Sequence, residues 1–237
     1  MSEEQLGSGP KVEVRTTADG SPTLYVPALD EHYHSRHGAR QESTHVFIEA
    51  GLRPLLAAGL GQSEPLRVLE VGLGTGLNAL LTLEAARETG ATVAYEGYET
   101  QPLPAAAVAA LAPQWAASQV LSRVFAQLHQ QPWDRALLLT ADFLLRKVRQ
   151  PIQVAALPGA AYDLIYFDAF APEKQPELWT ETVFAQLYAA AAPGAVLVSY
   201  CAQGQFRRNL RAAGWLTEKL PGPPGKREMT RARKPAA

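Results

Sequence analysis

Apolar and polar positions along this 237-residue chain alternate between a strand-like and a helix-like spacing. Short apolar runs predict the strands, which are expected at 66–71, 92–98, 136–141, 162–167 and 195–200. Longer segments with helical spacing lie between or after them, at 76–88, 103–135, 178–191 and 203–213. This alternation predicts an α/β fold with a doubly wound, mostly parallel sheet, whose ligands bind at the carboxyl ends of the strands.

The two ends of the chain depart from the alternation. Near the N-terminus, β-prone runs at 12–15 and 23–26 flank Asp19-Gly20, which favours a hairpin. A helix is expected over 43–58 with Ser43 as its N-cap. Near the C-terminus, 215–220 and 227–232 predict a final antiparallel pair. Residues 1–11 are polar and expected to be disordered, which leaves 12–237 as one domain with a hairpin and lid over 12–60.

Composition excludes several classes of protein. Hydrophobic residues make up 47% of the chain and charged residues 19%, which fits one soluble domain with a sizeable core. A single cysteine, Cys201, rules out an internal disulfide and a cysteine cage for a metal. The N-terminus has no signal pattern and no apolar run reaches membrane-spanning length, so we expect a cytoplasmic protein without a membrane partner.

The net charge of −1 conceals an asymmetry between the two parts of the chain. Residues 201–237 contain nine Lys or Arg and two Glu, a net charge of +7, so residues 1–200 carry −8. A basic face on an acidic body indicates an anionic partner such as nucleic acid. The alternative interpretation is a solvated tail beside an ordinary basic helix.

The most informative segment is the strand, glycine turn and helix of residues 67–83. Glu70 ends the strand, and the turn Gly72-Leu73-Gly74-Thr75-Gly76 follows. A dinucleotide fingerprint needs G-x-G-x-x-G, but here the third glycine comes one residue early. The E-x-G-x-G-x-G pattern resembles motif I of the Rossmann-like methyltransferases that use S-adenosyl-L-methionine. That resemblance implies this cofactor, held by Glu70, Gly72, Gly74, Thr75, Gly76 and Asn78; the alternative is an ordinary glycine-rich turn, with Asn78 capping the helix.

Three acids follow successive predicted strands at the edge where ligands are expected. Glu99 could accept hydrogen bonds from both ribose hydroxyls, Asp142 could contact the adenine amino group, and Asp168 could lie over the transferable methyl. A single acid at such a place is more often a turn former or helix cap. Three of them on one edge favour the binding interpretation.

Longer segments resemble one family specifically. HYHSRHGARQESTHVF (32–47), DAFAPEKQPELW (168–179) and GPPGKREM (222–229) are similar to the MnmC N-terminal domain and its stand-alone MnmD-type form, which methylate tRNA wobble uridine. The resemblance implies N-methylation of 5-aminomethyl-2-thiouridine in the anticodon loop of tRNA, with separate enzymes supplying that base. It implies Asp168 as catalytic residue and the following substrate-binding residues: Tyr33, His34 and Ser35 in a lid, Phe170, Pro172 and Trp179 around the base, and Arg207, Arg208, Lys226 and Arg227 on phosphates.

Other interpretations of the sequence remain. The spacing of His32, His34 and His37 can hold zinc, but no cysteine or close acid pair completes a usual site, so we expect no metal. A polyamine aminopropyltransferase or another small-molecule methyltransferase could share the glycine motif. A non-catalytic tRNA-binding module on the same fold is the third possibility, against which the set of glycines and acids argues.

Overall fold

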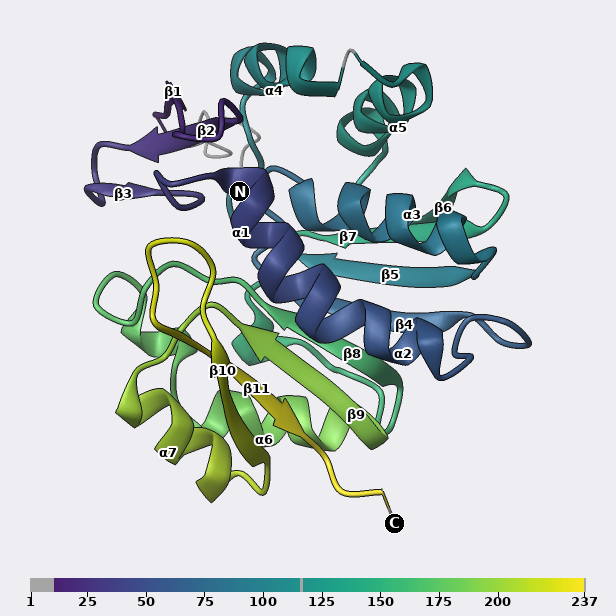
Figure 1. The fold of residues 1–237 in the computed structure, drawn as a ribbon, viewed down its shortest axis with the longest axis vertical. Coiled ribbons are helices and arrows are strands. Elements are labelled where there is room, and N and C mark those ends of the chain that lie inside the picture. Colours follow the sequence, from purple (N-terminus) through teal and green to yellow (C-terminus); the bar gives the residue numbers. More distant parts are fainter. Residues whose placement is uncertain (1–10, 116, 237) are drawn as a thin grey trace, which may run out of the picture.

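An eight-stranded sheet forms the centre of the computed structural model, which describes residues 11–115 and 117–236 (Figure 1). The strands lie in the order β10-β11-β9-β8-β4-β5-β7-β6. Their bounds are β4 (Leu66–Val71), β5 (Val93–Tyr98), β6 (Ala136–Thr140), β7 (Phe143–Val148), β8 (Tyr162–Phe167), β9 (Ala191–Ser199), β10 (Leu216–Pro221) and β11 (Glu228–Arg233). Strands β9, β8, β4, β5 and β7 pair in parallel, whereas β6 and β11 pair antiparallel to their neighbours. The predicted Rossmann-like fold with an antiparallel last strand is confirmed.

Helices cover both faces of the sheet because alternate residues of the central strands are apolar on both sides. Tyr166 of β8 packs with Phe47 on one face, and the next residue, Phe167, packs with Phe184 on the other. The helices are α1 (Ala39–Ser43), the π-helical η2 (Thr44–Leu52), α2 (Arg53–Ala57), α3 (Leu77–Thr89), α4 (Ala105–Leu111), α5 (Gln119–Gln130), α6 (Glu181–Ala190) and α7 (Gly204–Ala212). Short 3-10 turns are η3 (Ala112–Trp115), η4 (Ile152–Val154) and η5 (Pro176–Leu178).

The N-terminal segment forms a small sheet of its own beside the large one. Strands β1 (Glu13–Thr16) and β2 (Pro22–Val26) make the predicted hairpin, and β3 (Glu31–His32) adds to it. The chain then runs into α1, η2 and α2, which form one continuous helical rod across the sheet in Figure 1. This order places residues 33–38 between the small sheet and the helical rod. Residues 1–10 lie outside the described residues, so the structure does not test the prediction that residues 1–11 are disordered.

Two local predictions are wrong. The first helix begins at Ala39, so Ser43 is a buried residue within the helical rod and not its N-cap. The expected parallel strand at 136–141 is the antiparallel β6, and the parallel strand is β7, which follows it after a tight turn. Because only two residues join β6 to β7, the spacing of apolar positions did not reveal two separate strands there.

Candidate active site

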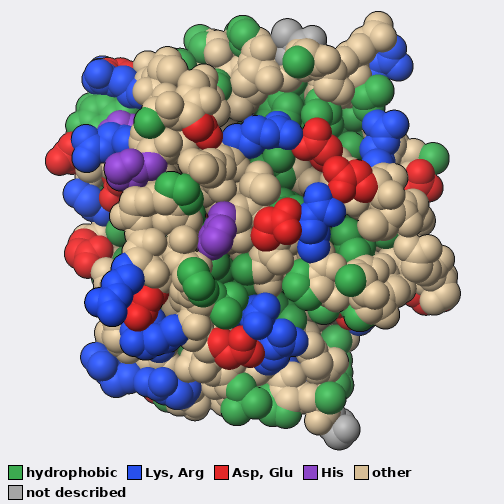
Figure 2. Space-filling view, viewed as in Figure 1, with side chains coloured by type: hydrophobic (Ala, Val, Ile, Leu, Met, Phe, Trp, Pro, Cys, Tyr) green, Lys and Arg blue, Asp and Glu red, His purple; other side chains and the backbone are tan. Residues whose placement is uncertain are grey.

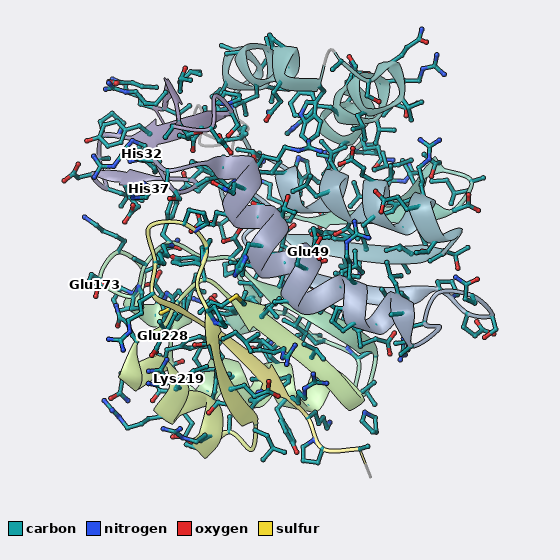
Figure 3. All side chains as sticks on the ribbon, in the orientation of Figure 1. His32, His37, Glu49, Glu173, Lys219 and Glu228 are labelled. Carbon is teal, nitrogen blue, oxygen red and sulfur yellow. The ribbon has the colours of Figure 1, made fainter. Side chains whose placement is uncertain are left out.

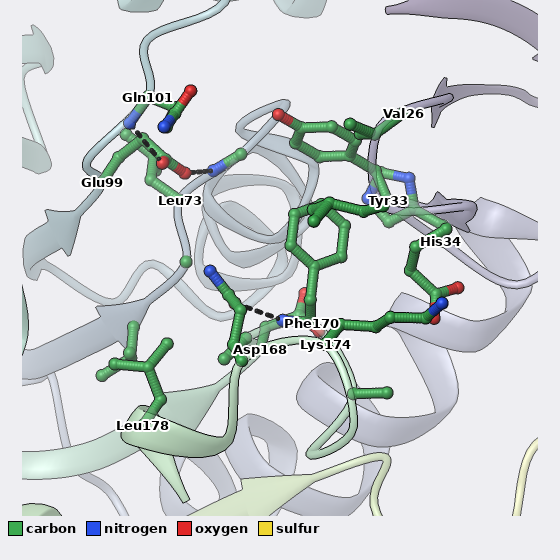
Figure 4. A pocket seen from close by; sticks show the side chains of 18 of the residues that line it. Val26, Tyr33, His34, Leu73, Glu99, Gln101, Asp168, Phe170, Lys174 and Leu178 are labelled. Atoms are coloured by element: carbon green, nitrogen blue, oxygen red, sulfur yellow. Dashed lines mark hydrogen bonds between the residues drawn. The ribbon is translucent and has the colours of Figure 1, made fainter. Parts of the chain in front are cut away.

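A cavity of about 930 Å³ opens at the carboxyl ends of β4, β5 and β8. This volume lies at the upper end of the range for small-molecule sites. The lining comes from the glycine turn, the ends of four strands, residues 31–36 and the β10–β11 loop. Figure 4 shows side chains from these segments pointing toward one another around the cavity. The arrangement matches the ligand edge that the alternation of strands and helices predicts.

The glycine turn fits closely between the end of β8 and residue 33. Gly72 has a φ of 91°, and a Cβ there would lie 2.5 Å from the backbone oxygen of Asp168. Gly74 has a φ of 49°, and a Cβ would lie 3.1 Å from the Tyr33 ring. Both positions therefore need glycine, because a side chain would strain the backbone and fill the space beside the cavity. The turn leaves room for a ligand along its backbone.

Glu99 joins the end of β5 to this turn. Its carboxylate accepts backbone N–H groups from Gly74 at 3.0 Å and from Thr100 and Gln101 at 2.8 Å each. Figure 4 shows Glu99 between these donors. Burial raises the pKa of Glu99, and the three donors oppose that rise. Since a carboxylate accepts about four hydrogen bonds, Glu99 lines the cavity with acceptor capacity left for a ligand hydroxyl.

Asp168 lies at the end of β8 and is held by an amide. Asn78 Nδ2 donates to Asp168 Oδ2 and to Glu70 Oε1, both at 2.8 Å. The second Glu70 oxygen accepts the Tyr95 hydroxyl at 2.8 Å. Burial raises the pKa of Asp168 to about 7, while the Asn78 hydrogen bond lowers it. Asp168 can therefore exchange a proton near neutral pH, which suits a general acid or base.

Residues 33–35 close one side of the cavity. Tyr33 meets Phe170 edge to face, with ring centroids 5.1 Å apart. His34 lies 3.3 Å from the Thr23 hydroxyl and 3.4 Å from the Thr75 hydroxyl, and burial lowers its pKa to about 4. The His34 ring is therefore neutral at physiological pH. The structure brings together the predicted residues Tyr33, His34, Ser35, Phe170, Gly72, Gly74, Thr75, Asn78, Glu99 and Asp168 around one cavity.

Several predicted residues lie elsewhere. Asp142 precedes β7, and its carbonyl accepts the N–H of Val93 at the amino end of β5, so it lies at the opposite edge of the sheet. The predicted contact of Asp142 with adenine is therefore wrong. The carboxyl end of β7 instead leads to Gln150, Ile152 and Gln153, which line the cavity and which sequence reasoning missed.

Four more predicted residues do not line the cavity. Glu70 is fully buried beneath the glycine turn, where it fixes Asn78. Gly76 is the N-cap of α3, and a Cβ there would lie 2.9 Å from the Leu128 side chain. Trp179 belongs to the core between Phe167 and Phe206, and its indole N–H donates to the Phe170 carbonyl at 2.9 Å. It supports the loop after β8 and does not stack on a base. Pro172 is also set back, while its neighbours Ala171 and Lys174 reach the cavity.

The predicted phosphate-binding cations have different surroundings. Lys226, predicted to contact phosphates, lines the cavity and pairs with Glu42 at 2.6 Å. Arg207 is mostly buried beside Glu228 at 3.4 Å. Arg208 bonds the neutral amide of Gln205, and Arg227 is exposed. The sequence carries no signal for a role of Glu42, because only the fold brings this residue to Lys226.

Two further findings concern the part of the chain that the structure describes. Within residues 11–115 and 117–236, no group of three or more His, Cys, Asp and Glu is placed to hold a metal ion. His37 packs against Gly225, and His129 lies 3.3 Å from the Thr75 carbonyl. No described helix is both long and apolar enough to cross a membrane.

Comparison with known proteins identifies relatives of this chain. A model of an S-adenosyl-L-methionine-dependent methyltransferase family matches residues 114–235, just over half of the chain. The tRNA 5-methylaminomethyl-2-thiouridine biosynthesis bifunctional protein MnmC of Magnetococcus marinus is 36% identical over 227 residues, which cover 88% of this chain and 32% of the relative. The protein of the same name from Pseudomonas aeruginosa is 33% identical over 211 residues, covering 85% and 32%.

The chain thus spans about a third of the length of these relatives. Among solved structures, MnmC2 from Aquifex aeolicus superposes with a TM-score of 0.76 at 24% identity, covering 96% of this chain and 72% of that one. The superposition supports the fold.

Proposed function

The chain belongs to the family of S-adenosyl-L-methionine-dependent methyltransferases, and on that premise we propose that it methylates 5-aminomethyl-2-thiouridine at the wobble position of tRNA. The methyl group moves from sulfur to the primary amine, one amine proton is lost, and 5-methylaminomethyl-2-thiouridine results. The names of the MnmC relatives, which cover most of the chain, support this choice of substrate.

The described residues fit the cofactor. Gly72 and Gly74 keep side chains away from the space beside the turn, and Glu99 offers a carboxylate at the end of the next strand. Such a carboxylate commonly binds ribose hydroxyls in folds of this kind. When bound, S-adenosyl-L-methionine supplies a methyl group that is already activated. Gln150, Ile152 and Gln153 line the adjoining end of the cavity and can surround an adenine.

The observation that carries the proposal is the partly buried Asp168 carboxyl that lines the cavity. An alkyl amine is protonated at neutral pH and must lose a proton before its lone pair can attack. Because Asn78 occupies Oδ2, the other oxygen of Asp168 is left to accept an amine N–H. With a pKa of about 7, Asp168 can take the released proton near physiological pH. Orientation of the amine then supplies much of the rate.

Aromatic rings next to Asp168 suit a flipped base. Phe170 lines the cavity two residues after Asp168, and Tyr33 meets it from the opposite segment. Extruded bases are held by such rings. The wobble base lies in a single-stranded loop, so its extrusion from the stack needs little energy.

The proposal is tested by incubating the protein with S-adenosyl-L-methionine and an anticodon stem-loop RNA that carries 5-aminomethyl-2-thiouridine. Mass spectrometry of the digested nucleosides should show a gain of one methyl group on that base. Asp168→Ala should lower the single-turnover rate by about a hundredfold or more, the scale of general acid–base catalysis. An unmodified base after prolonged incubation with saturating cofactor would reject this substrate. A product formed only with decarboxylated cofactor would indicate aminopropyl transfer.

A further inference from the structure

An ion pair inside the cavity is not used by the cofactor site or by Asp168. Glu42 of α1 and Lys226 of the β10–β11 loop lie 184 positions apart in sequence, and their charged atoms are 2.6 Å apart. Both residues line the cavity, and Glu42 is only 7% exposed. The Lys226 side chain is 34% exposed, and a partly buried ion pair adds little to stability, because desolvation and solvent screening offset the attraction. Its position therefore points to a role toward a ligand.

Neighbouring segments hold both charges in place. The backbone N–H of Ser35 donates to Glu42 Oε2 at 2.7 Å. Lys226 Nζ lies 4.0 Å from the centre of the Tyr200 ring, and the Tyr200 hydroxyl donates to the carbonyl of Ala169 at 2.8 Å. Only one aromatic ring thus separates Lys226 from the residue that follows Asp168. The carboxylate and the ammonium group both keep hydrogen-bonding capacity beyond these contacts.

The order of the strands places this pair on the far side of Asp168 from the cofactor residues. The glycine turn follows β4 and Glu99 follows β5, whereas Asp168 follows β8. Tyr200 follows β9, the next strand outward, and Lys226 lies between β10 and β11. The Glu42–Lys226 pair therefore faces the methyl acceptor and not the cofactor.

We propose that Glu42 and Lys226 read the pyrimidine edge of the base, with Glu42 accepting from N3–H and Lys226 donating to O4. This inference rests on the proposed function. In a 5-aminomethyluracil the amine, O4 and N3–H follow one another along the ring, and the same cavity offers Asp168, Lys226 and Glu42 as acceptor, donor and acceptor. Cytosine reverses both polar groups, since its N3 is an acceptor and its exocyclic N4 a donor. The pair therefore selects uracil over cytosine and leaves the 2-position unread.

The test compares two anticodon stem-loop RNAs that carry 5-aminomethyluridine or 5-aminomethylcytidine at the wobble position. The parent protein should prefer uridine in kcat/KM by at least about a hundredfold, since two polar contacts are mismatched in cytidine. Glu42→Gln should reduce this ratio to below about tenfold, because an amide can also donate to cytosine N3. Calorimetry should give the same affinity for S-adenosyl-L-methionine in both proteins.

Two further variants separate base reading from a structural latch. Glu84→Gln removes an exposed ion pair between Glu84 of α3 and Arg40, which lies on α1 as Glu42 does. This variant should leave the uridine preference unchanged. The double variant Glu42→Lys with Lys226→Glu restores an ion pair with the donor and acceptor exchanged. It should not recover the uridine preference if the pair reads the base.

Three outcomes would overturn the inference. Recovery of the uridine preference in the exchanged double variant would show that the pair only latches the lid. Weaker cofactor binding by Glu42→Gln would place the pair at the amino acid part of the cofactor. Equal discrimination by the parent and Glu42→Gln would show that other groups read the base. If the parent methylates neither these RNAs nor the stem-loop that carries 5-aminomethyl-2-thiouridine, the proposed function fails and this inference falls with it.

Discussion

At the scale of single residues, Asp168 makes the most direct pH prediction. Its carboxyl accepts a proton only when ionised, and burial raises its pKa to about 7. The single-turnover rate at saturating substrate should therefore fall as pH decreases through about 7. Asn78→Ala removes the donor that lowers this pKa, so the acid limb should move to higher pH and the maximal rate should drop. The charges that also face Asp168 are Glu42, Glu70 and Lys226.

The matched control for Asn78 is Thr82→Val, one turn further along α3. Thr82 is buried and shares a hydrogen bond with Tyr166 at 3.0 Å, outside the cavity lining. This variant should keep the acid limb where the parent has it. If the rate of Asn78→Ala falls at the same pH as the rate of the parent, the Asn78 amide does not lower the pKa of Asp168. Rapid-quench measurements across a pH series from about 5.5 to about 9 provide the profile.

Glu99 gives a residue-scale prediction about the cofactor. Glu99→Ala should weaken binding of S-adenosyl-L-methionine by about 1.5–3 kcal/mol, the range for hydrogen bonds to a charged group. Calorimetric titration measures this loss. Glu96→Gln is a suitable control, because Glu96 lies on β5, does not line the cavity, and bonds Tyr98, Tyr162 and Arg146. An affinity for Glu99→Ala equal to that of the control would remove Glu99 from the cofactor site.

The sequence predicted the residues that directly follow a parallel strand, and it missed those that reach the cavity from a distance. Glu99 and Asp168 could be placed because a strand end fixes its position on the sheet edge. Asp142 was misplaced because two residues separate an antiparallel strand from the parallel one. Glu42 and Tyr200 carry no local signal, since their roles depend on contacts with Lys226 and Ala169.

At the scale of elements, residues 31–36 and Lys226 of the β10–β11 loop line the cavity, and His37 joins these two segments. Gly225 has a φ of 86°, and a Cβ there would collide with the His37 ring. Figure 3 shows His37 close to the tip of this loop. The loop therefore needs glycine at position 225, both for the positive φ of its backbone and for its close contact with His37. The sequence predicted the strand pair and its tight connector, but the contact with the lid required the fold.

Gly225→Ala should displace this loop and separate Lys226 from Glu42. We expect a lower kcat/KM for tRNA with little change in cofactor affinity, since the glycine turn and Glu99 lie across the cavity. Gly59→Ala is the matched control, because Gly59 has a similar φ of 89° but a Cβ there meets nothing within 4 Å. Both variants should lose about 1–3 kcal/mol of stability from backbone strain, measured by urea denaturation. Equal tRNA kinetics in the two variants would show that the lid contact does not matter.

At the scale of the whole molecule, folding changes the meaning of the basic C-terminal segment. Glu218 pairs with Arg231 and Arg233, and Glu228 pairs with Arg207 and Lys219. Four of the nine cations of this segment thus contact its two carboxylates, and the basic side chains are not presented as one bare surface. In Figure 2, Lys and Arg side chains nevertheless gather at the lower left, over α7 and the β10–β11 hairpin. This face adjoins the wall of the cavity that Lys226 lines.

Among the described residues of this face, Arg208, Arg211 and Arg227 form no ion pair, and Arg208 and Arg227 are the two that the sequence predicts on phosphates. If they contact phosphates, the double variant Arg208→Ala with Arg227→Ala should weaken tRNA binding and flatten its salt dependence. The slope of log K against log salt should decrease by about 1.4–1.8, which corresponds to two contacts at roughly 0.7–0.9 each. Arg233→Ala, which breaks a pair with Glu218 instead, should leave the slope nearly unchanged. Fluorescence anisotropy with labelled tRNA across a salt series measures both, and parallel lines for the parent and the double variant would identify this face as a solvated surface.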